Sequence, residues 1–276
     1  MSERLEILRP ILSQFKRRFS VFSLGSGIES GIEQEIANEF DCTVICAEKD
    51  PLRYTPQGRM IVLQREFSAE DLDTLSKCEH FDVVLAMNVL HWTNGEWSDY
   101  LMFLRRMSSY VVVQTPMSND TQACGEFNKE IQSYCSYRMK ILGESVQFDG
   151  HMPRPIYWMR GIHGTMTAKT FGSPDGEIEA QVTEDGFIDL RHKKEFQRFI
   201  PGLTLTNYKL LNGVYPPREA IVSALREMKW DGKHRDIQPW NIRFTGQECY
   251  LIDPGGSDWP DSDEENLEAV IQWVNQ

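Results

Sequence analysis

Five short apolar segments, separated by helical segments, occupy the first part of the chain and restrict its fold more than any other feature of the sequence. They occur at the start of VFSLGSGIESGIEQEIANEF and in CTVICAEKDP, RMIVLQREF, FDVVLAMNVLHW and SYVVVQTPM. Apolar, β-branched runs of this length are typical of strands that are buried on both faces, and strands that alternate with helices form parallel sheets with helices on both sides. The sequence therefore predicts an α/β fold with a doubly wound, mostly parallel sheet.

A glycine-rich turn joins the first of these strands to a helix. In VFSLGSGIESGIEQEIANEF, Gly25, Gly27 and Gly31 follow the apolar run. Glycine permits a tight turn and the close approach of a ligand, and the first helical N–H groups remain free to donate hydrogen bonds. Glu48 ends the second strand, 23 positions after Gly25, where an acidic side chain commonly binds ribose hydroxyls. The pattern predicts a nucleotide-type cofactor site.

The motifs in this part resemble those of the class I S-adenosylmethionine-dependent methyltransferases, which have a Rossmann-like fold. The similarity rests on SLGSGIESG, AEKD, REF and FDVVLAMNVLHW. It implies S-adenosylmethionine as the cofactor, with its methionine part at the backbone of Gly25 and Gly27, its ribose at Glu48 and its adenine at Glu66 and Phe67. NAD is the alternative for such a turn, although the spacing is GxGxxxG and not GxGxxG.

The segment after the fourth strand leads toward the reaction centre in this family. Asn88 and His91 are therefore expected near the departing methyl group, Asn88 as a cofactor contact and His91 as the catalytic residue, with packing beside Trp92 as the alternative role of the histidine. Ser23 stands where the family usually has an acidic residue. ILGESVQF and RPIYWMRG are expected to form the antiparallel pair that closes the sheet, so a methyltransferase domain is expected over residues 1–161.

The stretch HRDIQPWNIRFTGQECYLIDPGG resembles the catalytic loop and metal-binding turn of protein kinases. Phosphoryl transfer needs a carboxylate that orients the attacking hydroxyl, and oxygen ligands that hold magnesium against the nucleotide phosphates. The resemblance implies that Asp236 is catalytic and that Asn241 and Asp253 bind magnesium together with ATP. Residues 162–276 are expected to form a smaller, shortened α+β kinase-like module, in which Pro254 replaces the usual aromatic residue of the metal-binding turn.

The net charge and the lengths of the apolar runs limit which partners and which cellular location we expect. The formal net charge is −12, whereas sequence-independent binding to nucleic acid requires clustered Lys and Arg, so nucleic acid is not an expected partner. No apolar run approaches the roughly 20 residues that span a bilayer, and the N-terminus lacks the apolar core of a signal peptide. We therefore expect no transmembrane segment and a cytoplasmic location. The sequence carries no indication of the oligomeric state.

Methyltransferase and kinase-like motifs in this order resemble the bifunctional methyltransferase-kinase enzymes that cap bacterial surface polysaccharides. The resemblance implies methyl transfer to an oxygen nucleophile of a small-molecule or glycan acceptor, or of a glycan phosphate. Two alternatives stay open at this point. The C-terminal part could act as a small-molecule or sugar kinase, or both parts could persist as a non-catalytic binding or regulatory protein.

Overall fold

The computed structural model describes most of the chain. The described stretches are residues 2–29, 31–117, 127–146, 152–162, 180–182, 187–190, 195–198, 200–228, 237–252 and 263–274. Asp236 and Asp253 lie outside them. Along these stretches, no helix is long and apolar enough to cross a membrane.

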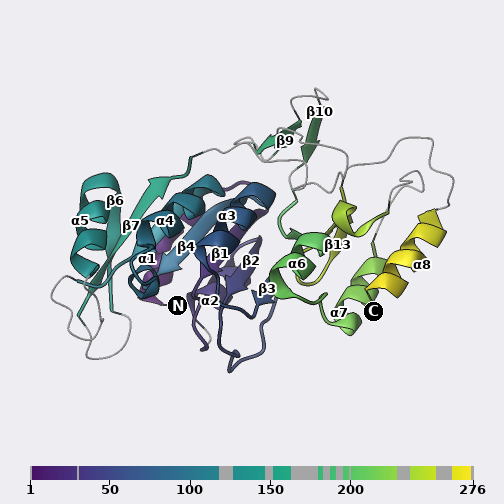
Figure 1. Ribbon diagram of the computed structural model, residues 1–276, viewed down its shortest axis with the longest axis horizontal. Helices are drawn as coiled ribbons and strands as arrows, with labels where there is room; N and C mark the ends of the chain where they lie inside the picture. Colours follow the sequence, from purple (N-terminus) through teal and green to yellow (C-terminus); the bar gives the residue numbers. More distant parts are fainter. Residues whose placement is uncertain are drawn as a thin grey trace.

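A seven-stranded, mostly parallel sheet forms the centre of the first part of the chain (Figure 1). Its strands are β1 (Phe19–Leu24), β2 (Cys42–Ala47), β3 (Met60–Leu63), β4 (Phe81–Met87), β5 (Ser108–Gln114), β6 (Lys140–Ser145) and β7 (Arg154–Arg160). The strand order is β3-β2-β1-β4-β5-β7-β6. The first five strands pair in parallel, and β7 pairs antiparallel with both β5 and β6. The predicted doubly wound sheet and its closing antiparallel pair are confirmed.

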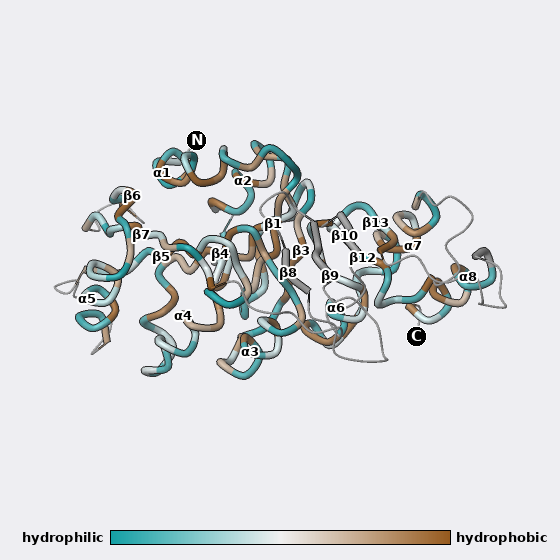
Figure 2. Tube along the Cα trace, turned by 90° about the horizontal axis from the view of Figure 1, so that it is seen from above, coloured by the Kyte–Doolittle hydropathy of each residue, from teal (hydrophilic) through white to brown (hydrophobic). Residues whose placement is uncertain are grey.

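Helices cover both faces of this sheet, as Figure 2 shows from above. They are α1 (Glu3–Leu12), α2 (Ile32–Glu39), α3 (Ala69–Cys78), α4 (Trp97–Arg106) and α5 (Asn128–Arg138). The buried side chains of α1 and α2 belong to one apolar cluster, whereas those of α3, α4 and α5 belong to the other. The central strands contribute alternate side chains to the two clusters, because successive side chains of a strand point to opposite faces. Val21 and Val83 pack with the first cluster, and Phe22 and Val84 with the second.

The described stretches of the second part of the chain form two small antiparallel sheets and three helices. Its elements are β8 (Ala180–Val182), β9 (Phe187–Leu190), β10 (Glu195–Arg198), β11 (Leu203–Thr204), α6 (Leu205–Asn212), α7 (Arg218–Arg226), the 3₁₀ turn η3 (Pro239–Asn241), β12 (Ile242–Phe244), β13 (Cys249–Leu251) and α8 (Asp263–Trp273). One sheet has the order β10-β9-β8 and the other β11-β12-β13. Buried residues of α6, α7, α8 and β12 continue the apolar cluster that covers the α3 and α4 face of the large sheet.

A buried ion pair joins the two parts of the chain. Glu79, at the end of α3, accepts hydrogen bonds from Arg243 Nη2 at 2.7 Å and from Asn207 Nδ2 at 2.7 Å. The side chains of Glu79 and Arg243 are each 1% exposed. Burial raises the pKa of the Glu79 carboxyl even though Arg243 and Asn207 favour its charged form. Both parts of the chain therefore contribute to the burial of this ion pair.

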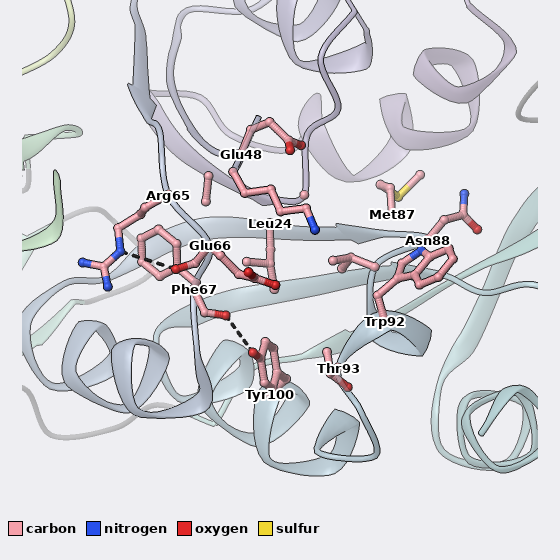
Figure 3. A pocket seen from close by; sticks show the side chains of 14 residues that line it. Leu24, Glu48, Arg65, Glu66, Phe67, Met87, Asn88, Trp92, Thr93 and Tyr100 are labelled. Carbon is pink, nitrogen blue, oxygen red and sulfur yellow. Dashed lines mark hydrogen bonds between the residues drawn. The ribbon is translucent and has the colours of Figure 1, made fainter. Parts of the chain in front are cut away.

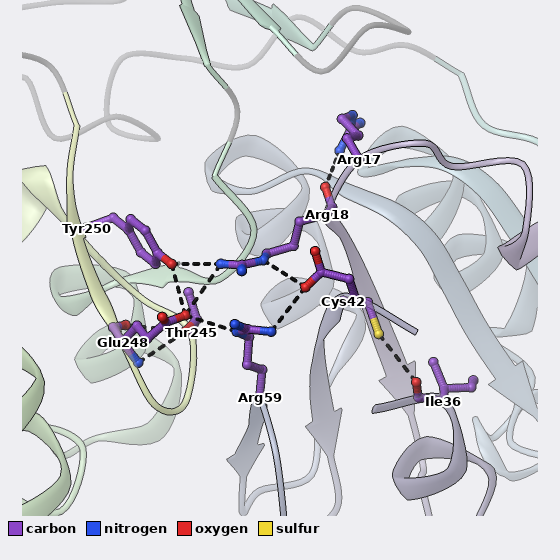
Figure 4. A network of polar contacts seen from close by, with 9 residues as sticks. Arg17, Arg18, Ile36, Cys42, Arg59, Thr245, Glu248 and Tyr250 are labelled. Atoms are coloured by element: carbon purple, nitrogen blue, oxygen red, sulfur yellow. Dashed lines mark hydrogen bonds and ion pairs between the residues drawn. The ribbon is translucent and has the colours of Figure 1, made fainter. Parts of the chain in front are cut away.

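A second, more exposed polar network ties the β12–β13 hairpin to the large sheet (Figure 4). Arg18 donates to the Tyr250 hydroxyl at 2.7 Å, and Arg59 pairs with Glu248 at 3.0 Å. Both arginines also contact Asp41 Oδ1 at 3.1 Å. Exposed ion pairs contribute little each, so this network fixes the orientation of the hairpin more than it stabilises the fold.

Candidate functional site

A pocket of about 420 Å³ opens at the carboxyl ends of β1, β2, β3 and β4 (Figure 3). Ligands of open α/β sheets bind at this edge, and the volume falls in the range of small-molecule sites. Five of the six predicted cofactor residues line the pocket, namely Gly25, Glu48, Glu66, Phe67 and Asn88. The sixth, Gly27, contacts one of these residues directly.

The glycine turn after β1 adopts the backbone conformation that its sequence predicts. Gly25 and Gly27 have φ values of +67° and +84°, which residues with a side chain rarely adopt. The Gly25 amide donates to Ala47 O at 2.8 Å, which ties the turn to the end of β2. A Cβ atom on Gly25 would lie 2.8 Å from Val89 Cγ2. The turn can therefore lie against the β4 end only with glycine at position 25.

Glu48 lies where the acidic partner of a ribose was expected, and it is anchored at both carboxylate oxygens. Oε2 accepts the Gly27 amide at 2.7 Å and Oε1 accepts the Asp50 amide at 3.2 Å. A carboxylate has about four lone-pair positions, so two hydrogen bonds leave acceptor capacity on the pocket side. The side chain is 9% exposed. The glycine turn and the β2 end thus hold one charged acceptor in a fixed place.

The turn after β3 forms another wall of the pocket. Phe67 is buried against Phe22, and its carbonyl accepts the Tyr100 hydroxyl at 2.7 Å. Glu66 beside it is exposed at the pocket surface. The Arg65 guanidinium lies 5.2 Å from the centre of the Phe67 ring. The predicted adenine contacts Glu66 and Phe67 therefore meet at one wall, with Tyr100 of α4 behind them.

Asn88 lines the pocket, and neighbouring groups determine the orientation of its amide. Gln114 Nε2 donates to the carbonyl oxygens of Ser145 and Arg154 at 3.4 and 3.3 Å, so Gln114 Oε1 must face Asn88. Asn88 Nδ2 donates to that oxygen at 2.8 Å. Asn88 Oδ1 is buried and has no hydrogen-bond partner among the described residues. The Asn88 amide is thus held in one orientation with its oxygen enclosed, on a residue with a φ of +60°.

His91 lies in the 3₁₀ turn η1 (Leu90–Trp92), directly after this strand end. Its side chain is 7% exposed, and its ring centre lies 4.8 Å from that of Trp92. Trp92 lines the pocket and is 60% exposed, whereas His91 is not among the lining residues. The expected catalytic role of His91 stays a prediction, and its ring supports the exposed Trp92.

Ser23 stands where the methyltransferase family that the motifs resemble usually has an acidic residue, and it lies beside the Glu33 carboxylate. Its hydroxyl donates to Glu33 Oε1 at 2.6 Å, and Glu33 is 2% exposed at the start of α2. Burial raises the pKa of the Glu33 carboxyl to about 6, and the nearby Glu48 adds to this rise, while the Ser23 hydroxyl and Arg4 oppose it. The Glu33 carboxyl of α2 therefore lies beside Ser23, so an acidic group is present near the glycine turn although it comes from the helix and not from β1.

Replacing Glu33 with Gln is expected to stabilise the protein above pH 6. The folded state holds the Glu33 proton up to about pH 6 and the unfolded state releases it near the ordinary pKa of 4.5, so stability falls as pH rises between these values. The shift corresponds to about 2 kcal/mol. Urea unfolding from pH 4 to 8 should show a gain for Glu33→Gln at pH 7.5 and none at pH 4. The exposed Glu29→Gln is the control, and parallel pH profiles for all three proteins would contradict a raised pKa of the buried Glu33 carboxyl.

Of the three site residues that the kinase-like motif implies, Asn241 alone lies within the described part of the chain. Asn241 is 1% exposed in η3, and its carbonyl accepts the Ile252 amide at 2.8 Å across the β12–β13 hairpin. The hairpin thus brings Asn241 beside the residue that precedes Asp253 in the sequence. Asp236 and Asp253 fall outside the described residues. The magnesium and catalytic assignments of these three residues stay predictions.

Sequence reasoning missed several lining residues. They include Arg65, Met87, Thr93 and Tyr100. Tyr100 gave no local signal, because an aromatic residue on an amphipathic helix usually belongs to the core. Arg65 precedes the predicted Glu66–Phe67 contact, so an analysis of the whole turn after β3 could have found it.

Comparisons with known proteins match the chain to solved structures. No protein-family model matches the sequence, and no curated protein matches it either. The crystal structure of WbdD matches 99% of this chain and 79% of its own, with a TM-score of 0.46 and 15% identity. Magnesium protoporphyrin IX methyltransferase from Synechocystis PCC 6803, with bound SAM, matches 58% of this chain and 79% of its own, with a TM-score of 0.41 and 12% identity.

A third similar structure is the N-methyltransferase NodS from Bradyrhizobium japonicum WM9 in complex with S-adenosyl-L-homocysteine. It covers 58% of this chain and 86% of its own, with a TM-score of 0.41 and 14% identity. At these TM-scores and identities, function has to be inferred from the pocket itself.

Proposed function

We propose that this protein is an S-adenosylmethionine-dependent methyltransferase. The observation that carries the proposal is the anchored Glu48 carboxylate, which one glycine amide holds at 2.7 Å at the carboxyl edge of a parallel sheet. This arrangement combines a charged acceptor for ribose hydroxyls with a turn that leaves room for a ligand backbone. NAD would use the same acceptor, but a dinucleotide also needs a pyrophosphate cradle, for which the GxGxxxG spacing is unusual.

The pocket residues fit S-adenosylmethionine. Glu48 would accept the ribose hydroxyls, the Glu66–Phe67 wall would receive the adenine, and the turn at Gly25 and Gly27 would lie along the methionine part. Asn88, whose buried Oδ1 has no hydrogen-bond partner among the described residues, lines the pocket at the end of β4. The bound cofactor would supply an electrophilic methyl group on a sulfonium.

The chain itself would contribute mainly positioning. The acceptor hydroxyl must lie in line with the methyl carbon, and we assign the contact beside the departing methyl group to Asn88, whose amide Gln114 holds in place. Holding two reactants in line is worth several kcal/mol of a reaction barrier. His91 is the proposed base for the released proton, and this role requires its ring to reach the acceptor hydroxyl.

A glycan is the acceptor class that we propose. Trp92 exposes 60% of its surface at the pocket, and a flat indole face can pack against the apolar face of a sugar ring. Aromatic side chains with one exposed face commonly serve binding. The oxygen nucleophile would then be a sugar hydroxyl or a glycan phosphate, and a free small molecule with the same groups is the simplest form of the acceptor.

Methyl-labelled S-adenosylmethionine, incubated with the protein and a panel of mono- and oligosaccharides, tests this assignment. The expected product is a labelled methyl ether, which resists mild alkali, and its formation should stop in Asn88→Gly. That variant relieves the left-handed backbone strain at position 88 while it removes the amide, so loss of fold does not explain a negative result. S-adenosylhomocysteine release without label in any sugar would reject the glycan acceptor.

The C-terminal part is proposed as a kinase-like module over residues 162–276, with the methyltransferase domain over residues 1–161. The β12–β13 hairpin favours this second function, because it joins Asn241 to the end of the YLID strand. Asp236 would orient a hydroxyl, and Asn241 with Asp253 would bind magnesium with ATP. A non-catalytic binding role of this module is the alternative.

A further inference from the structure

The last turn of α6 contacts the turn that forms the adenine wall of the pocket, although 148 residues separate the two in the sequence. The Gln64 amide donates to Asn212 Oδ1 at 3.1 Å, and Arg65 Nη1 donates to the Leu211 carbonyl at 2.8 Å. Asn212 Nδ2 donates to the Tyr208 hydroxyl at 3.3 Å, which leaves the amide oxygen facing Gln64. Gln64 and Arg65, at the start of the turn that forms this wall, are therefore tied to the second part of the chain.

The contact with Arg65 follows from the way α6 ends. Gly213 adopts a φ of +76° at the C-cap, and the last carbonyls of a helix lack partners within the helix. A cation is favoured at this negative end of the helix dipole. Arg65 satisfies the Leu211 carbonyl and also pairs with Asp71 at 2.7 Å. Arg65 thus bridges α6 and the first turn of α3.

The turn that these bonds hold lies directly at the pocket. Arg65, Glu66 and Phe67 line it, and the Arg65 guanidinium lies over the Phe67 ring. The other side of the turn is held by Tyr100, which donates to the Phe67 carbonyl, and by the capping box of α3. Asn212 itself is not among the lining residues. It acts on the pocket through the backbone of Gln64.

We propose that Asn212 is a positioning residue of the cofactor pocket, through which α6 of the C-terminal part holds the adenine wall in its binding geometry. This inference rests on the proposed methyltransferase function. It implies that cofactor binding and the docking of α6 favour each other, because the effect of one event on another is reciprocal in free energy. The turn η3 with Asn241 also packs against α6, so the two proposed sites share this helix.

Three variants of the full chain test the proposal by calorimetric titration with S-adenosylhomocysteine. Asn212→Ala removes the acceptor of the Gln64 amide and should weaken binding about 3- to 10-fold, the loss of one hydrogen bond. Asn212→Asp keeps an oxygen acceptor beside Arg65 and should retain the affinity. Leu210→Ala, on the exposed face of the same helix with 56% exposure, is the matched control and should also retain it.

Amide hydrogen exchange supplies a readout that does not need a ligand. Asn212→Ala should speed exchange of the Gln64 amide and of the following turn, whereas Asn212→Asp and Leu210→Ala should not. Unchanged exchange and unchanged affinity in Asn212→Ala would overturn the proposal, and so would an equal loss in Leu210→Ala. Failure of the unaltered protein to bind S-adenosylhomocysteine would count against the proposed function, while the exchange result would still decide the role of Asn212.

Discussion

Arg243→Met is expected to destabilise the protein by about 3–5 kcal/mol, because it leaves the Glu79 carboxylate buried without its cation. Both side chains are 1% exposed, and the pair spans the two parts of the chain. Urea unfolding at neutral pH measures the loss. It should shrink at pH 5, because the pKa of Glu79 is already raised by burial and a protonated carboxyl is easier to bury.

The double variant Arg243→Met with Glu79→Leu should regain most of this stability, since it removes the unpaired charge as well as its partner. Arg53→Met is the matched control. Arg53 pairs with Glu29 at the surface, where the two side chains are 68% and 70% exposed, and such pairs contribute about 0–1 kcal/mol. Equal losses in Arg243→Met and Arg53→Met would show that the buried pair does not hold the two parts together.

Glu48→Ala should weaken binding of S-adenosylhomocysteine about 5- to 150-fold, a cost of about 1–3 kcal/mol for a charged hydrogen-bond acceptor. The change removes the proposed ribose acceptor and also frees the Gly27 amide, which Glu48 accepts at 2.7 Å. The affinity of Glu48→Gln should lie between those of Glu48→Ala and the unaltered protein, because this variant keeps one acceptor oxygen and loses the charge. Isothermal titration measures all three.

Asp50→Ala is the control for this series. Asp50 carries the same charge two positions further on, is exposed, and does not line the pocket, so its loss should change affinity less than about twofold. Unaltered affinity in Glu48→Ala would remove the central residue of the proposed site.

Much of the first part of the fold follows from local sequence. Buried parallel strands are apolar on both faces, so the strands in VFSL, CTVICA and FDVVLAM can be predicted without knowing which strands they pair with. The glycine turn was predictable for the same reason, because the backbone at Gly25 and Gly27 needs positive φ values that few other residues adopt. Glu48 and the Glu66–Phe67 turn could be placed at the pocket because parallel strands end at a common edge.

The contacts between the two parts of the chain could not be predicted in this way. Glu79 and Arg243 are 164 positions apart, and each resembles an ordinary surface charge in its local sequence. Gly246 is similar: its φ is +94°, and a Cβ there would lie 2.5 Å from the Met60 carbonyl oxygen, but the sequence shows only a hairpin turn. A long-range contact depends on how whole elements pack, which local patterns do not encode.

This difference also changes how the pocket is understood. From the sequence, every expected cofactor contact precedes residue 161, and the described residues that line the pocket lie between Leu24 and Tyr100. The wall around Arg65 nevertheless depends on Leu211 and Asn212 of α6. The residues that line the site therefore come from the first part of the chain, whereas residues distant in the sequence hold one of its walls in place.

The pocket at the carboxyl edge of the large sheet is proposed to bind S-adenosylmethionine. Calorimetric titration of the intact protein with S-adenosylhomocysteine, and in parallel with NAD, tests it most directly. We expect saturable binding of one S-adenosylhomocysteine per chain and no competing binding of NAD. Absence of binding by S-adenosylhomocysteine, or its displacement by NAD, would contradict it.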